Sequence, residues 1–289
     1  MCPVLHLRLF GAPIDLHAYS LFAALAAAAG AVSALVILRR ERLGYLRSLL
    51  LLAAMATGFF LGARLWNWAV NPGNYAGGLT PFSFRLAGFS LYGGIVGAFA
   101  ALFAMSFVFR RGLWPLLDTF VLPTAAAFAL ARVGCFLNGC CGGRLTQGWL
   151  GVRFPHESVE PVLTIQTLPF FGNVDVDLDL PQYPTQLMEL VLALLGLAPA
   201  LWLYFRGKVP AGVPFLVYGI WFTAMRWGVL YFRALTYPEY VVHIIYPLIY
   251  AVLIVCGIVL LIQKLCPFYT STIYKASQVQ KLNNNNQSQ

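Results

Sequence analysis

Charged residues are scarce in this chain of 289 residues, because Asp, Glu, Lys and Arg together make up only 10% of it. A typical soluble domain contains about 25%. Hydrophobic residues make up 60% of the chain, and the mean hydropathy is +0.75. A chain with so few charges cannot present an ordinary water-facing surface. Apolar runs of about 20 residues recur along its length, which indicates a polytopic helical membrane protein.

A disulfide framework and a nucleic-acid-binding motif are also lacking. Three of the six cysteines, Cys135, Cys140 and Cys141, lie in one patch and the others are scattered. The net charge of +9 is typical of cytoplasmic loops in a membrane protein and does not indicate a nucleic-acid partner. The first apolar run is too long for a signal-peptide core and lacks a basic leader, so it is interpreted as a spanning helix.

The apolar runs predict an all-α polytopic protein with a transmembrane domain over residues 1–263. Its seven helices are expected at about 16–38, 48–70, 89–109, 115–136, 184–206, 213–232 and 242–263. Eleven Lys and Arg residues fall in the loops and tail on one side of the membrane, against five on the other. The positive-inside rule therefore predicts that the N-terminus is outside and the C-terminus is in the cytoplasm.

Three arginines fall inside the predicted helices: Arg64, Arg132 and Arg226. An arginine at the centre of a bilayer helix costs about 2.5–3.5 kcal/mol, so such a residue usually faces a partner in the protein interior or a watery cavity. Each lies in the later part of a helix that runs outward in the predicted topology. We therefore expect all three in the outer half of the membrane, around a polar site.

One loop, residues 137–183, is much longer than the others. It contains four prolines and an alternating VDVDLDL run at 174–180, which predicts a small extracytoplasmic α/β head. The acidic residues of that run are interpreted as a solvated strand face in preference to a cation site. Residues 264–289 end in NNNNQSQ and are expected to form a disordered cytoplasmic tail. No internal repeat is evident, which weighs against an inverted-repeat transporter.

The segment at 131–143, ARVGCFLNGCCGG, resembles a family signature. Bacterial prolipoprotein diacylglyceryl transferases carry the pattern G-R-x-G-N-F-x-N-x-E-x-x-G. Five positions of this chain match it: Arg132, Gly134, Phe136, Asn138 and Gly143. Three depart from it, with Ala131, Cys135 and Cys140 in place of the family's Gly, Asn and Glu.

Other segments of the first half resemble motifs of the same family in the same order. LHAYS, which contains Tyr19, is similar to its first-helix Tyr-Gly motif, and LGAR, which ends at Arg64, is similar to its G-x-R. FSLYGGIVG resembles S-F-H-G-G-x-x-G and retains Gly93 and Gly94. Tyr92 stands where the family has a histidine thought to be essential.

The second half continues the resemblance, which covers roughly residues 13–263. LLDTFVLP is similar to the segment that leads into the signature, and YPTQLMEL resembles H-P-S-Q-L-Y-E, with Gln186 and Glu189 retained. MRWGVLYFR carries Arg226 and Arg233 at the spacing of the family's F-R…F-F-R motif. Leu230 stands where the family usually has Glu.

The resemblance implies an enzyme that moves a diacylglyceryl group from phosphatidylglycerol to the lipobox cysteine thiol of a preprolipoprotein. A thioether forms, glycerol phosphate leaves, and no cofactor is used. The implied location is the bacterial plasma (inner) membrane, with the site toward the outer leaflet. The implied partners are phosphatidylglycerol, preprolipoprotein signal peptides and membrane lipid, with no nucleic acid.

The expected catalytic residues are Arg132, Arg226 and Tyr92. Guanidinium groups suit a phosphate leaving group because they bind it bidentately and stay charged. The expected substrate-binding residues are Arg64, Tyr19, Asn138, Gly93, Gly94, Gly143, Gln186, Glu189 and Arg233. A phenol has an unperturbed pKa near 10, against about 6.5 for imidazole. Tyr92 therefore either positions the head group while another residue activates the thiol, or marks a relative with altered chemistry.

Simpler interpretations stay open for several of these residues. Arg132 could form a structural ion pair with Asp118 or Glu189, and Gly93 and Gly94 could serve close helix packing. The cysteine patch could provide a nucleophilic thiol, small apolar packing or a disulfide; a metal is not expected, because three cysteines without an adjacent histidine are an incomplete zinc set. The alternative functions are a related diacylglyceryl transferase with a different acceptor, or a non-enzymatic lipid or anion transporter.

Overall fold

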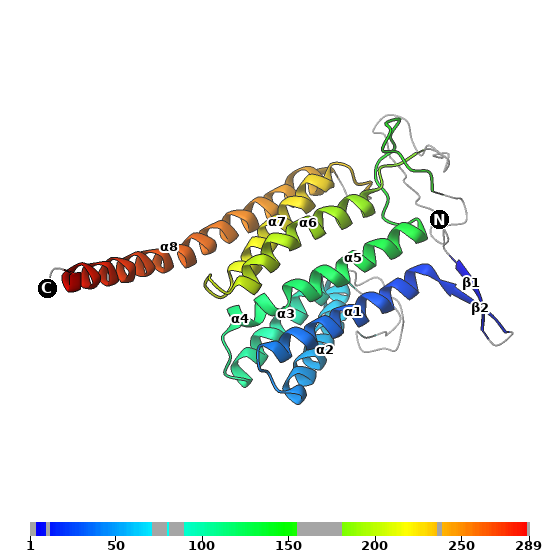
Figure 1. The fold of residues 1–289 in the computed structure, drawn as a ribbon. Coiled ribbons are helices and arrows are strands. Elements are labelled where there is room, and N and C mark those ends of the chain that lie inside the picture. The colour runs from blue at the N-terminus through cyan, green and yellow to red at the C-terminus, as the bar shows by residue number, and fades with distance from the viewer. Residues whose placement is uncertain are drawn as a thin grey trace. The chain divides into compact units, whose positions relative to one another are not determined.

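The structure is a computed structural model that describes residues 4–9, 12–70, 80, 90–154, 181–235 and 239–287 (Figure 1). The chain is mostly helical, as the composition predicts. The described elements are β1 (Val4–Leu9), β2 (Ala12–His17), α1 (Ala18–Arg40), α2 (Tyr45–Val70), α3 (Leu91–Val108), α4 (Leu113–Thr119), α5 (Val121–Asn138), α6 (Thr185–Arg206), α7 (Val213–Leu230), the π-helical turn η2 (Val241–Ile245) and α8 (Tyr246–Gln287).

Among the described residues, six helices are long and apolar enough to cross a membrane. Two consecutive helices, α4 and α5, make one of these spans, Leu113–Asn138. Part of α3, Gly93–Val108, is apolar but shorter than a full span. The predicted polytopic helical architecture is therefore confirmed, with seven apolar helical segments of which six meet the length needed for a bilayer.

The chain divides into two compact units. One comprises Met1–Gly30 and Val121–Gln289, and the other comprises Ala31–Phe120. The second boundary coincides with a break that the sequence did not predict, because the helix expected at 115–136 is interrupted at Phe120. Pro123 explains the break, since it has no N–H to donate to the carbonyl of Thr119 four residues earlier.

Close backbone packing of α2 against α3 dominates the unit Ala31–Phe120. Gly58 and Gly62 on α2 face Gly93 and Gly97 on α3. A Cβ added to Gly97 would overlap the carbonyl oxygen of Gly58. A Cβ added to Gly62 would overlap the carbonyl oxygen of Gly93. Small residues four apart on each helix allow this approach. The structure therefore favours the packing interpretation of Gly93. Gly94 lies against the ring of Phe59.

Replacing Gly97 with alanine is expected to lower the free energy of unfolding by about 1–3 kcal/mol, because the added methyl group forces α2 and α3 apart. Gly228→Ala on α7 is the matched control, since its added Cβ would meet nothing within 4 Å. That variant should be neutral or slightly stabilising, because alanine is the better helix former by about 1 kcal/mol. Thermal unfolding in detergent measures both; equal shifts would contradict the proposed close packing.

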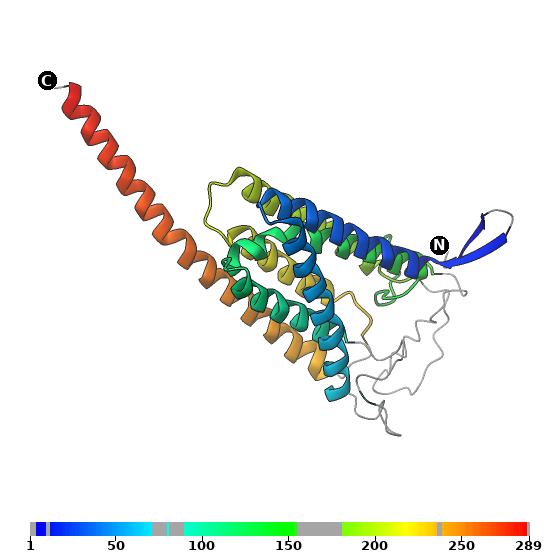
Figure 2. The ribbon, with the colours of Figure 1, turned by 90° about the horizontal axis from the view of Figure 1, so that it is seen from below.

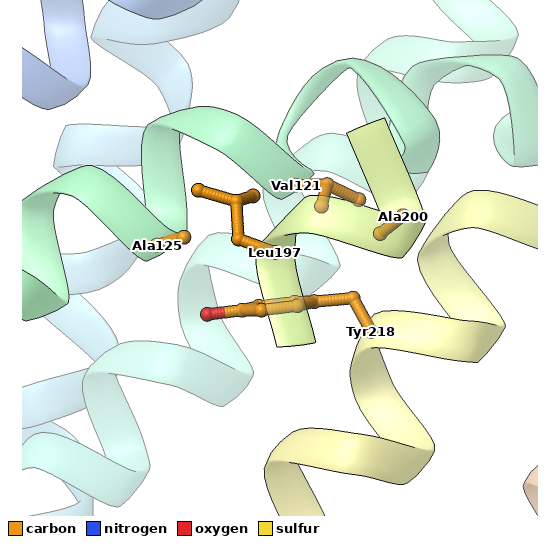
Figure 3. Close-up of a cluster of buried hydrophobic side chains, with 5 residues drawn as sticks. All are labelled: Val121, Ala125, Leu197, Ala200 and Tyr218. Carbon is orange, nitrogen blue, oxygen red and sulfur yellow. The ribbon is translucent and has the colours of Figure 1, made fainter. Parts of the chain in front are cut away.

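In the other unit, α6 packs against both α5 and α7, and α8 packs against α7 (Figure 1). A buried cluster joins α5, α6 and α7. It contains Val121, Ala125, Leu197, Ala200 and Tyr218 (Figure 3). Its two alanines are fully buried and allow the helices to approach closely. Figure 3 shows the Tyr218 ring reaching from α7 into this cluster. Among the described residues its buried hydroxyl has no hydrogen-bond partner.

Replacing Tyr218 with phenylalanine is expected to raise the free energy of unfolding by about 1 kcal/mol, because an unpaired buried hydroxyl is costly. The matched control is Tyr231→Phe, which removes a hydroxyl that accepts a hydrogen bond from Trp227 Nε1 at 3.2 Å on the exposed side of α7. The control should be neutral or slightly destabilising. If Tyr218→Phe destabilises the protein more than Tyr231→Phe does, the hydroxyl of Tyr218 has a partner after all.

The two ends of the chain differ from the sequence expectation. The first residues form an antiparallel hairpin in which Val4 pairs with His17 and Leu9 with Ala12, where no strand was expected. At the other end the structure continues α8 as a helix to Gln287, where a disordered tail was expected (Figure 2). Its 42 residues span about 63 Å, twice a hydrocarbon core of about 30 Å. The strand predicted at 174–180 lies outside the described residues.

Candidate active site

Three helix ends meet in the unit that contains α5, α6 and α7, and a short extended segment joins them. The Gly143 N–H donates to the Tyr183 carbonyl at 2.9 Å, and the Arg144 N–H donates to the Phe232 carbonyl at 2.8 Å. The Tyr183 N–H returns a bond to the Arg144 carbonyl at 3.1 Å. A Cβ on Gly143 would lie 2.5 Å from the Phe232 carbonyl oxygen, so this position requires glycine.

The C-terminus of α5 ends in a turn that brings two cysteines together. Gly139 is left-handed, with φ of 74°, and donates its N–H to the Phe136 carbonyl at 3.2 Å. The Cys140 N–H donates to the Cys135 carbonyl at 3.1 Å. This pair of bonds is a Schellman motif, for which a glycine at the left-handed position is the usual sequence signal. Cys140 therefore returns beside Cys135, and Cys141 follows with a positive φ of 61°.

Two buried side chains of α6 fasten this turn to the first turn of the helix. Gln186 Nε2 donates to the Cys140 carbonyl at 2.6 Å, and Thr185 Oγ1 donates to the Cys141 carbonyl at 2.9 Å. Gln186 was expected to bind substrate or pair with the arginines; the structure instead places its amide on the backbone of the cysteine turn. Thr185 was not singled out from the sequence, although it directly precedes Gln186 in the motif.

The carboxylate of Glu189, one turn further along α6, lies at the centre of three guanidinium groups. Arg226 Nη1 and Arg233 Nη1 both donate to Oε1, the latter at 2.9 Å. Arg132 Nε lies 2.8 Å from Oε2 as an ion pair, without the alignment of a hydrogen bond. The Arg132 guanidinium also lies 4.8 Å from the centre of the Phe128 ring. Of the two partners considered for Arg132, the structure brings Glu189 to it.

The charge of this Glu189–arginine cluster is unbalanced. Three guanidinium groups and one carboxylate leave a net charge of +2. The side chains of Arg132, Arg226 and Arg233 are 14%, 21% and 14% exposed, and that of Glu189 is 1% exposed. Because uncompensated charge in a poorly hydrated site is costly, the arrangement favours a bound anion. A phosphate group fits it, since guanidinium groups bind phosphate oxygens as planar forks.

The cysteines form a second cluster beside the arginines. The sulfur atoms of Cys135, Cys140 and Cys141 all lie within 4.8 Å of one another. Cys135 and Cys140 are buried and Cys141 is exposed. Thiol hydrogen bonds from Cys135 and Cys140, together with the positive charges of Arg233 and Arg132, hold the pKa of Cys141 well below its usual range. The side chain of Asn138 contacts the thiol of Cys140.

The structure thus gathers seven of the predicted site residues at one end of this unit: Arg132, Asn138, Gly143, Gln186, Glu189, Arg226 and Arg233. Tyr19 lies in the first turn of α1 in the same unit and is 50% exposed. Arg64, Gly93 and Gly94 belong to the unit Ala31–Phe120. The side chain of Tyr92 lies outside the part that the structure describes.

A second contributor to the site, after Thr185, was missed from the sequence. Arg144 follows Gly143 directly, and its Nε donates to the Arg233 carbonyl at 3.3 Å, which helps hold Arg233 in place. Its position next to the signature was the available signal. In the sequence, Arg144 was one of the five basic residues expected in loops on the outer side of the membrane, and no individual role was predicted for it.

Comparison with known proteins bears on the same residues. The sequence model of the prolipoprotein diacylglyceryl transferase family matches residues 7–264. The chain belongs to this family. The match includes every residue of the Glu189–arginine cluster and the cysteine cluster, so the resemblance predicted from the motifs is confirmed. Both buried cysteines occupy positions where the signature of this transferase family has other residues, Asn and Glu.

Curated relatives carry the name phosphatidylglycerol–prolipoprotein diacylglyceryl transferase. One from Escherichia fergusonii is 31% identical over 149 residues, which cover 50% of this chain and 51% of the relative. One from Escherichia coli O1:K1 / APEC is 30% identical over 191 residues, which cover 63% of this chain and 64% of the relative. The chain thus matches about half to just under two thirds of the length of these relatives.

Proposed function

We propose that this protein transfers a diacylglyceryl group from phosphatidylglycerol to the lipobox cysteine thiol of a preprolipoprotein, forming a thioether and releasing glycerol phosphate. The observation that carries this proposal is the Glu189–arginine cluster, in which three guanidinium groups surround one buried carboxylate. The leaving group of the reaction is a phosphate, and the cluster has the charge and the donors to hold it.

The transfer requires negative charge to build up on the phosphate oxygen as the carbon–oxygen bond breaks. Arg132 contacts Glu189 through Nε, and we assign its two terminal nitrogens to the phosphate. Glu189 positions Arg226 and Arg233 through one shared oxygen. Donors fixed in advance at the place where charge develops are usually the largest contribution to such a rate. Tyr19, Arg64, Tyr92, Gly93 and Gly94 stay candidates for contacts to the rest of the lipid.

The proposed location is the bacterial inner membrane, with the N-terminus outside and the C-terminus in the cytoplasm. The distribution of Lys and Arg between alternate loops supports this orientation. It places the C-terminal ends of α5 and α7, and with them the Glu189–arginine cluster, toward the outer leaflet. The loop 137–183 is then an extracytoplasmic head, and secreted preprolipoprotein signal peptides and phosphatidylglycerol reach the site from that side.

A related transferase with a different acceptor is the second candidate. The departures at Cys135, Cys140 and Tyr92 favour it, because they change positions of the family's motifs and leave the arginines intact. Both candidates use the same phospholipid and the same leaving group. They differ in the molecule that carries the new thioether or other bond after the reaction.

The test is an assay of the purified full-length protein in phosphatidylglycerol liposomes with a lipobox peptide. The proposal expects glycerol phosphate release together with a diacylglyceryl mass increase on the peptide, and neither with a peptide that has Ser in place of the Cys. Release of glycerol phosphate without modification of the peptide, with the diacylglyceryl group recovered on another acceptor such as water or a lipid hydroxyl, would favour the second candidate. Movement of labelled lipid between leaflets, with no glycerol phosphate released, would replace both candidates with a transporter.

A further inference from the structure

We propose that Cys135, Cys140 and Cys141 bind a zinc ion through their three sulfur atoms, and that the fourth coordination position takes the acceptor thiol. The second half of this proposal rests on the proposed function; the first half does not. The proposed zinc site departs from the sequence expectation, in which three cysteines without an adjacent histidine did not predict a metal. What changes the inference is that the fold gathers the three thiols and leaves one of the three residues, Cys141, exposed.

The geometry of the cysteine cluster fits a tetrahedral site with one ligand still to come. Three sulfurs at about 2.3 Å from zinc stand about 3.8 Å apart, and these three lie within 4.8 Å of one another. The Schellman turn after α5 sets the spacing of Cys135 and Cys140, and Thr185 fixes the carbonyl of Cys141. Small side-chain rotations are enough to close the site, because the backbone is already held.

Thiolate ligands select thiophilic metals such as zinc and copper(I). Zinc fits the proposed reaction better, because catalytic zinc sites keep three protein ligands and one open position for substrate. The exposure of the cysteines agrees with such an open site. Cys135 and Cys140 are buried, whereas Cys141 is exposed, so one side of the cluster is accessible.

The charges of the two clusters are opposite in sign. Zinc with three protein thiolates and one acceptor thiolate carries a net charge of −2, and the Glu189–arginine cluster carries +2. Arg132 and Arg233 lie close enough to Cys141 to act on its charge. The arginines that hold the phosphate therefore also stabilise the anionic centre beside them, which brings nucleophile and leaving group to one place.

The chemistry balances without an oxidant or a reductant. A thiol that coordinates a metal is deprotonated outright, and its proton passes to solvent. The acceptor sulfur then attacks the glyceryl carbon that carries the phosphate, and the carbon–oxygen bond breaks. The electron pair leaves on the phosphate oxygen that the arginines hold. This supplies the thiol activation that a tyrosine at position 92 is poorly suited to provide at neutral pH.

A covalent role for Cys141 fits the reaction less well. Attack by Cys141 on the same carbon would leave the diacylglyceryl group on the enzyme as a thioether. A thioether carbon is a poor target for a second thiol, because an alkyl thiolate leaves from saturated carbon far less readily than a phosphate does. The enzyme would stop after one turnover, whereas a metal-bound acceptor thiol ends as the product itself.

Metal content of the purified full-length protein tests the site directly. After purification without chelators under reducing conditions, mass spectrometry of the metals should find about one zinc per chain. Cys135→Ser, Cys140→Ser and Cys141→Ser should each weaken zinc binding by more than about tenfold. Cys256→Ser, which changes an exposed thiol on α8, is the control and should bind as the unaltered protein does.

Cobalt(II) in place of zinc keeps the test independent of how well the variants fold. The unaltered protein should show the thiolate-to-cobalt charge-transfer band and the visible bands of tetrahedral cobalt. A lipobox peptide should shift these bands, and the same peptide with Ser in place of Cys should not. Absence of both zinc and cobalt binding would overturn the proposal, as would a disulfide between two of the three cysteines or selective binding of copper(I).

The assays separate failure of this proposal from failure of the proposed function. Removal of the metal should abolish transfer, and added zinc should restore it. Full transfer activity without metal would overturn the zinc site and leave the transferase function standing. Zinc binding with a peptide-dependent cobalt shift but no use of phosphatidylglycerol would leave the site standing and overturn the proposed function.

Discussion

Replacing Glu189 with glutamine is expected to lower the free energy of unfolding by about 3–5 kcal/mol, the usual cost of removing one partner from a buried charge cluster. The glutamine has nearly the same shape, so the loss comes from charge. Without the carboxylate, Arg132, Arg226 and Arg233 are left as three positive charges around a neutral group. Because the side chain at position 189 is only 1% exposed, water cannot reach it to compensate for the lost negative charge.

Thermal unfolding in detergent measures this effect, and Glu239→Gln is the matched control because Glu239 is exposed. The control should change the melting temperature little. A second change, Arg233→Gln in the Glu189→Gln background, should recover part of the lost stability by removing one uncompensated charge; the double-mutant cycle gives the coupling. Equal melting temperatures for Glu189→Gln and Glu239→Gln would contradict the description of the cluster.

Arg132→Ala is expected to lower the transfer rate by about 100–1000-fold, the range seen when one donor to a developing negative charge is removed. The physical reason is that Arg132 meets Glu189 through Nε, while its planar end can reach the phosphate. The effect should appear in kcat, because charge on the phosphate oxygen builds up only as the bond breaks. The measurement is glycerol phosphate release from phosphatidylglycerol liposomes with a lipobox peptide.

Two variants separate this role from a structural one. Arg132→Lys keeps the charge near Glu189 and loses the planar fork, so it should preserve most of the stability and only part of the rate. Arg206→Ala lies at the far end of α6, where the guanidinium stacks 4.6 Å from the Trp202 ring, and it should transfer at the normal rate. An unchanged kcat in Arg132→Ala would remove Arg132 from the reaction.

The helices and the family could be predicted from the sequence because both depend on local patterns. Apolar runs of membrane length set the helices, and the order of short motifs along the chain identified the transferase family. The left-handed Gly139 and the Pro123 break also have local causes, although neither was drawn from the sequence. The tail at 264–289 was expected to be disordered from its polar composition, whereas α8 continues as a helix through residue 287.

The partners within the site depended on how the helices pack. Arg132 had two candidate carboxylates, and only the packing of α5 against α6 brings it to Glu189. Arg226 and Glu189 are 37 residues apart in the chain, and Gln186 and Cys140 are 46 apart. Neither hydropathy nor spacing carries information over such distances. Charge alone is also uninformative, because Coulomb attraction does not distinguish one carboxylate from another until the fold sets their separations.

The sequence by itself determined that this is a polytopic helical membrane protein with arginines inside its helices and a transferase signature. Those conclusions rest on short-range properties: apolar run length, charge per segment and motif order. Only the tertiary structure decided that two of these arginines, Arg132 and Arg226, share one carboxylate with Arg233, and that three thiols meet beside them. Both results require the ends of α5, α6 and α7 to meet, and that meeting is a property of helix packing, which no single segment contains.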